Sequence, residues 1–138
     1  MSTLMYKERY EEDAPYLPPL IQATHDEEAN IWWLSHRSGG TLMFRVDRRV
    51  LIVESCNTAE SATPGSVRDA FLTYLEEEAG IQGCRMIEFY DSVIPVDDVP
   101  KPGDYFTARG YVETASGKWI RPVGELSQSS QINVAQAA

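Results

Sequence analysis

Residues 66–80 read Ser-Val-Arg-Asp-Ala-Phe-Leu-Thr-Tyr-Leu-Glu-Glu-Glu-Ala-Gly, and this stretch predicts the main helix of the protein. Its apolar residues recur at spacings of three and four, as on one face of a helix. They are Val67, Ala70, Phe71, Tyr74 and Leu75. We expect Ser66 and Asp69 to cap the first turn as a capping box, and Gly80 is typical of a helix end. A helix over about 67–79 therefore presents one apolar stripe, which requires a sheet to cover it.

Upstream of this helix, two short segments have the pattern of β-strands. Residues 41–47 alternate apolar and polar side chains, which is the period of a half-buried strand. Residues 50–53, Val-Leu-Ile-Val, are too few for a helix and rich in β-branched side chains. The intervening Asp47-Arg-Arg49 predicts the turn of a hairpin.

Downstream of the helix, three more strands are expected. The first covers 85–94, and a proline-rich loop with a turn at 101–104 follows it. The second covers 105–113, where alternation is clear, and residues 114–117 turn the chain back into a third strand at 118–122. The expected fold is thus α+β, with an antiparallel sheet of four to six strands packed against one main helix.

The two ends of the chain differ in composition from this core. The first forty residues are acidic and are interrupted by Pro-Tyr-Leu-Pro-Pro at 15–19, which cannot continue a helix because proline lacks an amide donor. We expect short helical turns at 4–12 and 26–34. The predicted organisation is an N-terminal arm over 1–40, a core domain over 41–126 and a polar tail over 127–138.

The charge of the chain excludes some general functions. A net charge of −9 and a pI near 4.6 disfavour binding to phosphate backbones and to anionic membranes. The basic residues Arg45, Arg48 and Arg49 lie close together, but Asp47 and Glu54 dilute them, and we expect a solvated strand face there. No signal peptide or membrane span is visible, so a cytoplasmic location is expected.

Candidate catalytic groups are scattered in the sequence. His25 and His36 have no serine or cysteine motif beside them, and Cys56 lies in no recognised nucleophile signature. Cys56 and Cys84 are expected to be reduced thiols without a metal, because no ligand cluster surrounds them. The loop acids Asp91, Asp97, Asp98 and Asp104 match no cation-binding loop. No catalytic residue, metal site or cofactor is predicted.

Several residues are instead candidates for contacts with other protein chains. Trp32 and Trp33 are adjacent, so one is expected in the core and the other at an interface, where tryptophan is enriched. The acidic helix end and the apolar residues of the tail complete the set. The candidate interface residues are Trp32, Trp33, Glu76, Glu77, Glu78, Ile132 and Val134.

One part of the chain resembles a known enzyme family. The run Tyr74-Leu-Glu-Glu-Glu-Ala79, the strand expected at 85–94 and the turn Pro100-Lys-Pro-Gly-Asp104 are similar to the middle of hot-dog-fold thioesterases and dehydratases. The resemblance implies a central helix wrapped by a sheet and an activity on acyl thioesters. It implies Glu54 or Glu60 as the acid or base, with His36 as a further candidate.

The favoured prediction from the sequence is a non-enzymatic protein that acts through contacts with other chains. It rests on the lack of a catalytic constellation and on two polar arms that are poorly suited to a core. We expect a homo-oligomer or a component of a larger assembly, such as a virus or phage particle. The alternatives are the hot-dog enzyme and a small acidic inhibitor or immunity protein that binds a basic target through Glu76, Glu77 and Glu78.

Overall fold

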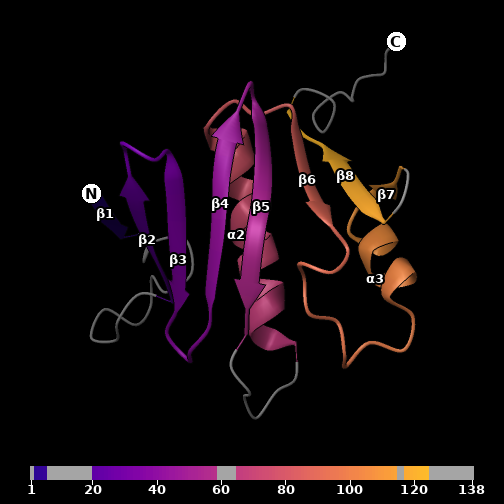
Figure 1. Ribbon diagram of the computed structural model, residues 1–138. Coiled ribbons are helices and arrows are strands. Elements are labelled where there is room, and N and C mark those ends of the chain that lie inside the picture. The colour runs from indigo at the N-terminus through magenta and orange to yellow at the C-terminus, as the bar shows by residue number, and fades with distance from the viewer. Residues whose placement is uncertain (1, 6–19, 59–64, 115–116, 125–138) are drawn as a thin grey trace.

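Among the residues that the structure describes, the protein is an α+β domain in which two helices cover an eight-stranded mixed sheet (Figure 1). The computed structural model describes residues 2–5, 20–58, 65–114 and 117–124. In chain order the elements are β1 (Ser2–Met5), β2 (Ile21–Asp26), β3 (Ile31–His36), β4 (Thr41–Asp47), β5 (Val50–Asn57), α2 (Ser66–Ile81), β6 (Met86–Tyr90), α3 (Pro102–Ala108), β7 (Val112–Glu113) and β8 (Lys118–Pro122).

The strand order is β1-β2-β3-β4-β5-β6-β8-β7. All neighbours pair antiparallel except β5 and β6, which are parallel. This parallel pair is possible because α2 carries the chain from the end of β5 back to the start of β6. The α+β class is confirmed, but the sheet is larger than four to six strands and is not wholly antiparallel.

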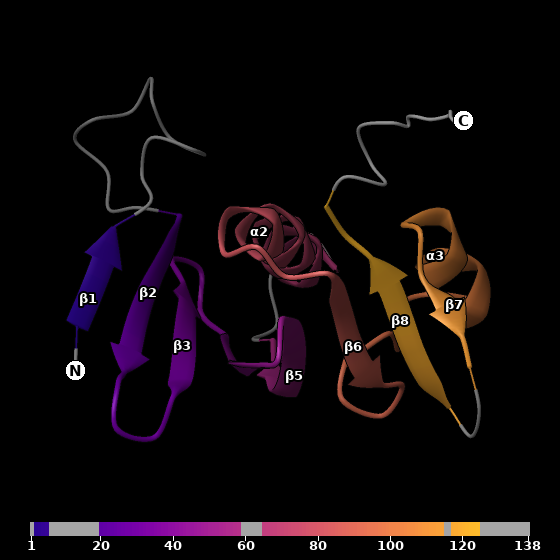
Figure 2. The same ribbon diagram turned by 90° about the horizontal axis from the view of Figure 1, so that it is seen from above.

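The core lies between α2 and one face of the sheet (Figure 2). Phe71 and Leu75 of α2 are fully buried, as are Leu34 and Phe44 of the strands. The predicted helix is therefore confirmed, with its apolar stripe on the sheet. Because α2 lies on one face of an open sheet, the wrapped helix implied by the hot-dog resemblance is wrong.

The ends of α2 differ from the prediction. Gly65 is the N-cap residue, with a left-handed φ of 84°, and Ser66 is the first helical residue, so the expected capping box does not form. The helix continues through Gly80 to Ile81. The predicted boundary rests on glycine alone, whereas the helix ends with Gln82 as its C-cap and the φ angle becomes positive only at Gly83.

The hairpin of β4 and β5 is confirmed. Arg48 and Arg49, at φ values of 53° and 66°, form its turn. The hairpin of β7 and β8 is confirmed as well, and Thr114 N–H donates to the Lys118 carbonyl at 2.8 Å to close it.

Two predictions of local structure are wrong. The helical turn expected at 26–34 is the hairpin of β2 and β3, in which Asp26 Oδ1 accepts the amide of Ala29 and Asn30 takes a left-handed φ of 56°. This sheet therefore includes part of the segment expected to be an arm. Of the strand expected at 105–113, only Val112 and Glu113 form a strand, β7. Residues 105–108 lie in α3, because Pro102 favours a first helical turn and Phe106 packs on Phe89 and Trp119.

Other expectations fall outside the described part of the chain. They include the kink at 15–19, most of the turn at 4–12, Glu60, and the tail with Ile132 and Val134. Leu4 and Met5 belong to β1, a strand. None of the helices in the described ranges is both long and apolar enough to span a bilayer.

Candidate functional site

The sheet opens between β5 and β6, and this opening is the first feature of the candidate site. The parallel pairing covers only Val50, Leu51 and Ile52, whereas β5 stays paired with β4 as far as Asn57. The two strands separate toward their C-terminal ends (Figure 1). The backbone groups of 53–57 that face β6 therefore have no strand partner in the described part of the protein, and they can hydrogen-bond a ligand.

A β-bulge lies in β5 at the same place. Phe44 pairs with Val53 and Met43 pairs with Ser55, so Glu54 is the extra residue. Bulges reorient side chains and are frequent beside active sites. The carboxylate of Glu54 accepts a hydrogen bond from Arg45 Nε at 2.5 Å, on the face of the sheet opposite α2.

The N-terminus of α2 follows the end of β5. Position 65 requires glycine, because the backbone is left-handed there and because a Cβ would meet the Arg68 guanidinium and lie 2.8 Å from Asp98 Oδ2. Asp98 therefore lies close to the positive end of the helix dipole, where a negative charge is stabilised.

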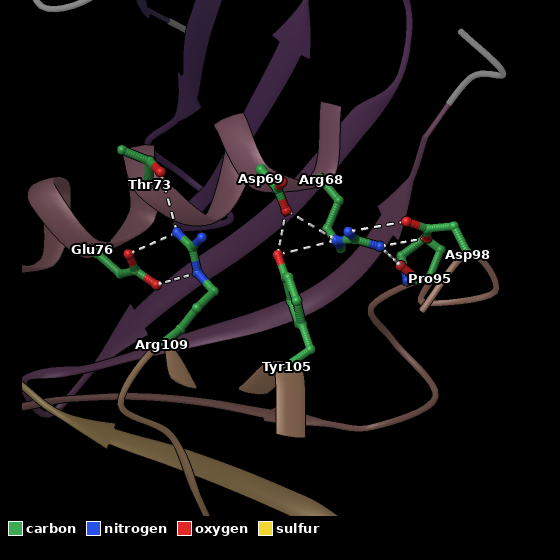
Figure 3. A network of polar contacts seen from close by, with 8 residues as sticks. All are labelled: Arg68, Asp69, Thr73, Glu76, Pro95, Asp98, Tyr105 and Arg109. Atoms are coloured by element: carbon green, nitrogen blue, oxygen red, sulfur yellow. Dashed lines mark hydrogen bonds and ion pairs between the residues drawn. The ribbon is translucent and has the colours of Figure 1, made fainter. Parts of the chain in front are cut away.

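Arg68 is the centre of a polar network between α2, the loop after β6 and α3 (Figure 3). Its side chain is only 5% exposed. Nη1 donates to Asp98 Oδ1 at 2.6 Å and to the Pro95 carbonyl at 3.2 Å, and the guanidinium lies 4.4 Å from the ring centre of Tyr105. Burial by itself lowers the pKa of Arg68, but its hydrogen bonds to Asp98 and Tyr105 outweigh this and raise the pKa. The same contact lowers the pKa of Asp98.

Tyr105, in the first part of α3, completes this network. Its hydroxyl donates to Asp69 Oδ1 and accepts from Arg68 Nε at 3.1 Å. Burial, and then the hydrogen bond to Asp69, raise the pKa of Tyr105 to about 12. The phenol is protonated at neutral pH, as an unperturbed tyrosine also is, and the raised pKa makes it a weaker acid than a free tyrosine.

A second set of contacts joins the middle of α2 to the end of α3. Arg109 donates to Glu76 Oε1 at 2.9 Å and to Oε2 at 3.2 Å, and also to Thr73 Oγ1 (Figure 3). The Tyr111 hydroxyl donates to Glu76 Oε2 at 3.1 Å. Burial alone lowers the pKa of Arg109, but Glu76 raises it above the ordinary value. These contacts fix α3 against α2.

Several residues considered from the sequence lie apart from the opening. His25 stacks on Trp32 with ring centres 4.0 Å apart, and Trp32 stacks in turn on Phe44. His36 meets Phe71 edge-on, and burial, followed by Arg37, lowers its pKa. Both histidines thus have packing contacts, His25 within the sheet and His36 with α2.

The two cysteines and the loop acids lie in different environments. Cys56 and Cys84 are free, and burial raises the pKa of Cys56 to about 12, which disfavours the nucleophilic thiolate. Of the loop acids, Asp98 alone joins the Arg68 network, while Asp91 lies beside Gly117.

The candidate interface residues are spread over different surroundings. Trp33 is 42% exposed, while Trp32 packs against the core, as expected for adjacent strand residues. Glu77 is exposed, Glu76 is paired with Arg109 and Glu78 is buried, so the three acids do not form one solvated face. The basic cluster also divides, since Arg45 pairs with Glu54 and Arg49 donates to the Gly83 carbonyl. The interface itself stays a prediction.

Arg68, Asp69, Tyr105 and Arg109 were missed as site residues. In the sequence, Arg68 and Asp69 appear as the polar face of a helix, and Tyr105 and Arg109 as the outer face of a strand. Arg68 itself could have indicated the site. It is a cation next to Val67, among the residues that α2 buries, and a buried cation requires partners.

Solved structures similar to this chain are acyltransferases. The ribosomal-protein-S18-alanine N-acetyltransferase from Escherichia coli aligns with a TM-score of 0.52 at 12% identity, over 89% of this chain and 92% of that one. An acetyltransferase of the GNAT family from Staphylococcus aureus aligns at 0.48 and 10% identity, over 71% and 74%. A putative acyl-CoA N-acyltransferase from Klebsiella pneumoniae aligns at 0.48 and 11% identity, over 88% and 97%.

No protein-family model matches the chain, and no curated protein matches its sequence. The likeness to the Escherichia coli enzyme shows that this chain has the fold of that acetyltransferase. The function expected from the sequence is contradicted by this shared fold. Neither a structural or virion component nor the hot-dog enzyme nor the acidic inhibitor agrees with the fold that this chain shares with the Escherichia coli acetyltransferase.

Proposed function

We propose that this protein is an N-acyltransferase that moves an acyl group from a coenzyme A thioester to an amine. The observation that carries the proposal is the opening between β5 and β6 beside the N-terminus of α2. The shared fold with the Escherichia coli N-acetyltransferase supports it. Ligands of sheets with parallel strands commonly bind at the carboxyl ends of those strands.

The reaction has three requirements. The amine nitrogen attacks the thioester carbonyl carbon, so that a C–N bond forms and the C–S bond breaks. The attacking nitrogen loses a proton, and the departing thiolate gains one. Negative charge develops on the carbonyl oxygen before the C–S bond breaks, and hydrogen-bond donors placed at that oxygen lower the barrier.

The backbone of β5 supplies such donors. Its amides beyond Ile52 that face β6 are held rigidly by the pairing of β5 with β4. An extended thioester chain inserted between β5 and β6 can hydrogen-bond the unpaired backbone groups of β5, as an added strand does. An amide of this segment then polarises the carbonyl.

Tyr105 donates the proton to the leaving thiolate. Its hydroxyl is protonated at neutral pH, as that of an unperturbed tyrosine also is, and its contacts with Arg68 and Asp69 orient it at the start of α2. A positioned general acid contributes about 100- to 10,000-fold to a rate.

Glu54 receives the proton of the amine, directly or through water. The bulge places its carboxylate on the face of the sheet opposite α2 and α3. The amine and the thioester thus approach from opposite faces of the sheet. Arg45 orients the carboxylate from the neighbouring strand.

The start of α2 only partly suits the negatively charged diphosphate of coenzyme A, because some groups there attract an anion and one repels it. The 16-residue helix directs the positive end of its dipole to this place, and Arg68 adds a cation. Asp98 opposes an anion here, because its carboxylate takes two donors of the same guanidinium. The incoming diphosphate therefore competes with Asp98 for Arg68.

A thiol-release assay with Tyr105→Phe tests the proposal. The purified protein is mixed with acetyl-coenzyme A and a panel of amines that includes free lysine and short peptides with free N-termini, and the released thiol is measured. We expect thiol release that depends on the amine, and a kcat at least about 100-fold lower in Tyr105→Phe at similar KM.

The control is Tyr90→Phe, which removes a hydroxyl from an exposed tyrosine away from the network and leaves kcat unchanged. The proposal is refuted if acetyl-coenzyme A neither binds in calorimetry nor reacts with any amine of the panel. Equal kcat values for Tyr105→Phe and the native protein would remove the role of Tyr105.

A further inference from the structure

A carboxylate of the protein itself lies at the start of α2, where the diphosphate of coenzyme A would meet the helix dipole. Asp98 Oδ1 accepts a hydrogen bond from Arg68 Nη1 at 2.6 Å, and Oδ2 accepts one from Nη2 at 3.3 Å (Figure 3). A Cβ at the N-cap residue Gly65 would lie only 2.8 Å from Oδ2, so the carboxylate lies against the end of the helix. The place beside the helix is therefore taken by a negative charge that the chain supplies.

Arg68 is committed to this arrangement. Every nitrogen of its guanidinium already donates to an acceptor, since Nε reaches Asp69 and Tyr105, Nη1 also reaches the Pro95 carbonyl, and both Nη atoms reach Asp98. Two donors on one carboxylate form one of the stronger ion-pair geometries, and the Arg68 side chain is only 5% exposed to competing water. A diphosphate has to displace Asp98 and leave that carboxylate beside its own charges. Arg68 therefore adds little net attraction for the nucleotide.

The charges of the surrounding segments are mostly negative. Residues 65–69 and 95–105 supply the partners of Arg68, and they contain two cations, Arg68 and Lys101, against four carboxylates. The carboxylates are Asp69, Asp97, Asp98 and Asp104. Lys101 is exposed, and a single exposed lysine attracts an anion weakly. Because the chain also carries a net charge of −9, the approach of a nucleotide with several phosphate charges is opposed.

The opening between β5 and β6 suits the other part of coenzyme A. The pantetheine arm, which carries the thioester, is uncharged and contains amide groups. In the described part of the protein, the backbone groups of 53–57 that face β6 have no strand partner, and the pairing of β5 with β4 holds them in place. Amides of an extended arm can pair with these groups without meeting the carboxylates at the start of α2.

We propose that the protein recognises its acyl donor through the pantetheine arm and gains little from the nucleotide, so that thioesters of pantetheine alone are donors as well. Asp98 is the residue that determines this specificity, because it withholds Arg68 and repels phosphate. The inference rests on the proposed acyl transfer, whose donor class it defines.

Calorimetry on the full chain compares coenzyme A with pantetheine, and thiol-free kinetics compare acetyl-coenzyme A with S-acetylpantetheine on the most reactive amine of the panel. We expect the two Kd values to differ by less than about tenfold. We expect the two kcat/KM values to differ by less than about tenfold as well. A donor site built on the nucleotide would instead lose most of its affinity when the nucleotide is removed.

Asp98→Asn tests the residue that carries the argument. Removing the carboxylate charge frees Arg68 for phosphate, so coenzyme A binds at least about tenfold more tightly while the Kd of pantetheine stays the same. The matched control is Asp97→Asn, which removes an exposed carboxylate outside the network and changes the ratio of the two Kd values less than about twofold. Circular dichroism shows whether each variant is folded, and the comparison in the native chain needs no variant.

The possible failures are distinguishable. If coenzyme A and pantetheine both bind but coenzyme A binds at least about tenfold more tightly to the native chain, this inference is wrong and the proposed acyl transfer stands. An unchanged Kd of coenzyme A in folded Asp98→Asn also overturns it. If neither compound binds and neither thioester reacts, the proposed function fails and this inference fails with it.

Discussion

Arg68 shows how one buried charge organises the candidate site. A guanidinium with 5% of its side chain exposed is costly unless its donors are satisfied, and here Asp98, Asp69, Tyr105 and the Pro95 carbonyl accept them. These partners come from α2, from the loop after β6 and from α3. The residue therefore joins three segments through one side chain.

Asp98→Asn is expected to lower the free energy of unfolding by about 2 kcal/mol at pH 7, because Arg68 then loses the shorter of its two ion pairs and keeps only the one with Asp69. The effect depends on pH. Since the pKa of Asp98 is lowered in the folded state, its stabilising effect is complete above the unfolded value of about 3.9 and disappears as the pH falls through the folded value. Urea unfolding at several pH values between 7 and 2 measures the loss of stability at pH 7 and its dependence on pH.

We therefore expect the native protein and Asp98→Asn to converge in stability at low pH. The neighbouring Asp97→Asn, an exposed carboxylate outside the network, should follow the native curve. A constant difference between the native protein and Asp98→Asn from pH 7 down to pH 2 would contradict the ion pair with Arg68.

The elements of the site depend on turns that place them. The β4–β5 turn uses two arginines in left-handed conformations, Arg48 and Arg49, where L-residues with long side chains are strained. This geometry matches the twist of the two strands, which is why tight hairpins use it. It brings β5 into register with β4 and so positions the bulge at Glu54.

Arg48→Asn is expected to raise the free energy of unfolding by about 0.5–1 kcal/mol, because asparagine adopts a left-handed φ more readily than arginine. Thermal unfolding measures the gain as an increase in Tm. Arg85→Asn is the matched control, since Arg85 is an exposed arginine with a negative φ, and it should give no gain. A loss of stability in Arg48→Asn would show that the turn is not strained at this residue.

At the scale of the whole molecule, the two helices are tied together by polar contacts. Arg109 binds Glu76 with two donors, and the two side chains are only 21% and 17% exposed. Together with the Arg68 network, this ion pair holds α3 beside α2. Ion pairs shielded from water with two parallel hydrogen bonds couple more strongly than exposed pairs do.

A double-mutant cycle with Glu76→Ala and Arg109→Ala is expected to give a coupling energy of at least about 1.5 kcal/mol. The control cycle uses Arg45 and Asp47, an exposed pair at 3.6 Å, and should give less than about 1 kcal/mol. Chemical denaturation of the four proteins in each cycle provides the values. Coupling no larger in the first cycle than in the control would show that the α2–α3 contact contributes little to stability.

The sequence by itself determined the local elements whose signals are local. The helix at 67–79 follows from apolar residues three and four apart, and the β4–β5 hairpin follows from alternation around Asp47-Arg-Arg49. The sequence did not determine whether residues 102–108 form a strand or a helix. The alternation there also fits a helix with a single buried side chain, Phe106. The packing of Phe106 on Phe89 and Trp119 settles that choice.

Only the tertiary structure decided the parallel pairing of β5 with β6 and the site that it creates. Arg68 meets Asp98 across 30 positions and Tyr105 across 37, and Asp91 shares a pocket with Glu113 and Trp119. These neighbours come together because α2 carries the chain across the sheet and α3 folds back on it. No spacing in the sequence records such a contact, because the packing of whole elements sets its distance.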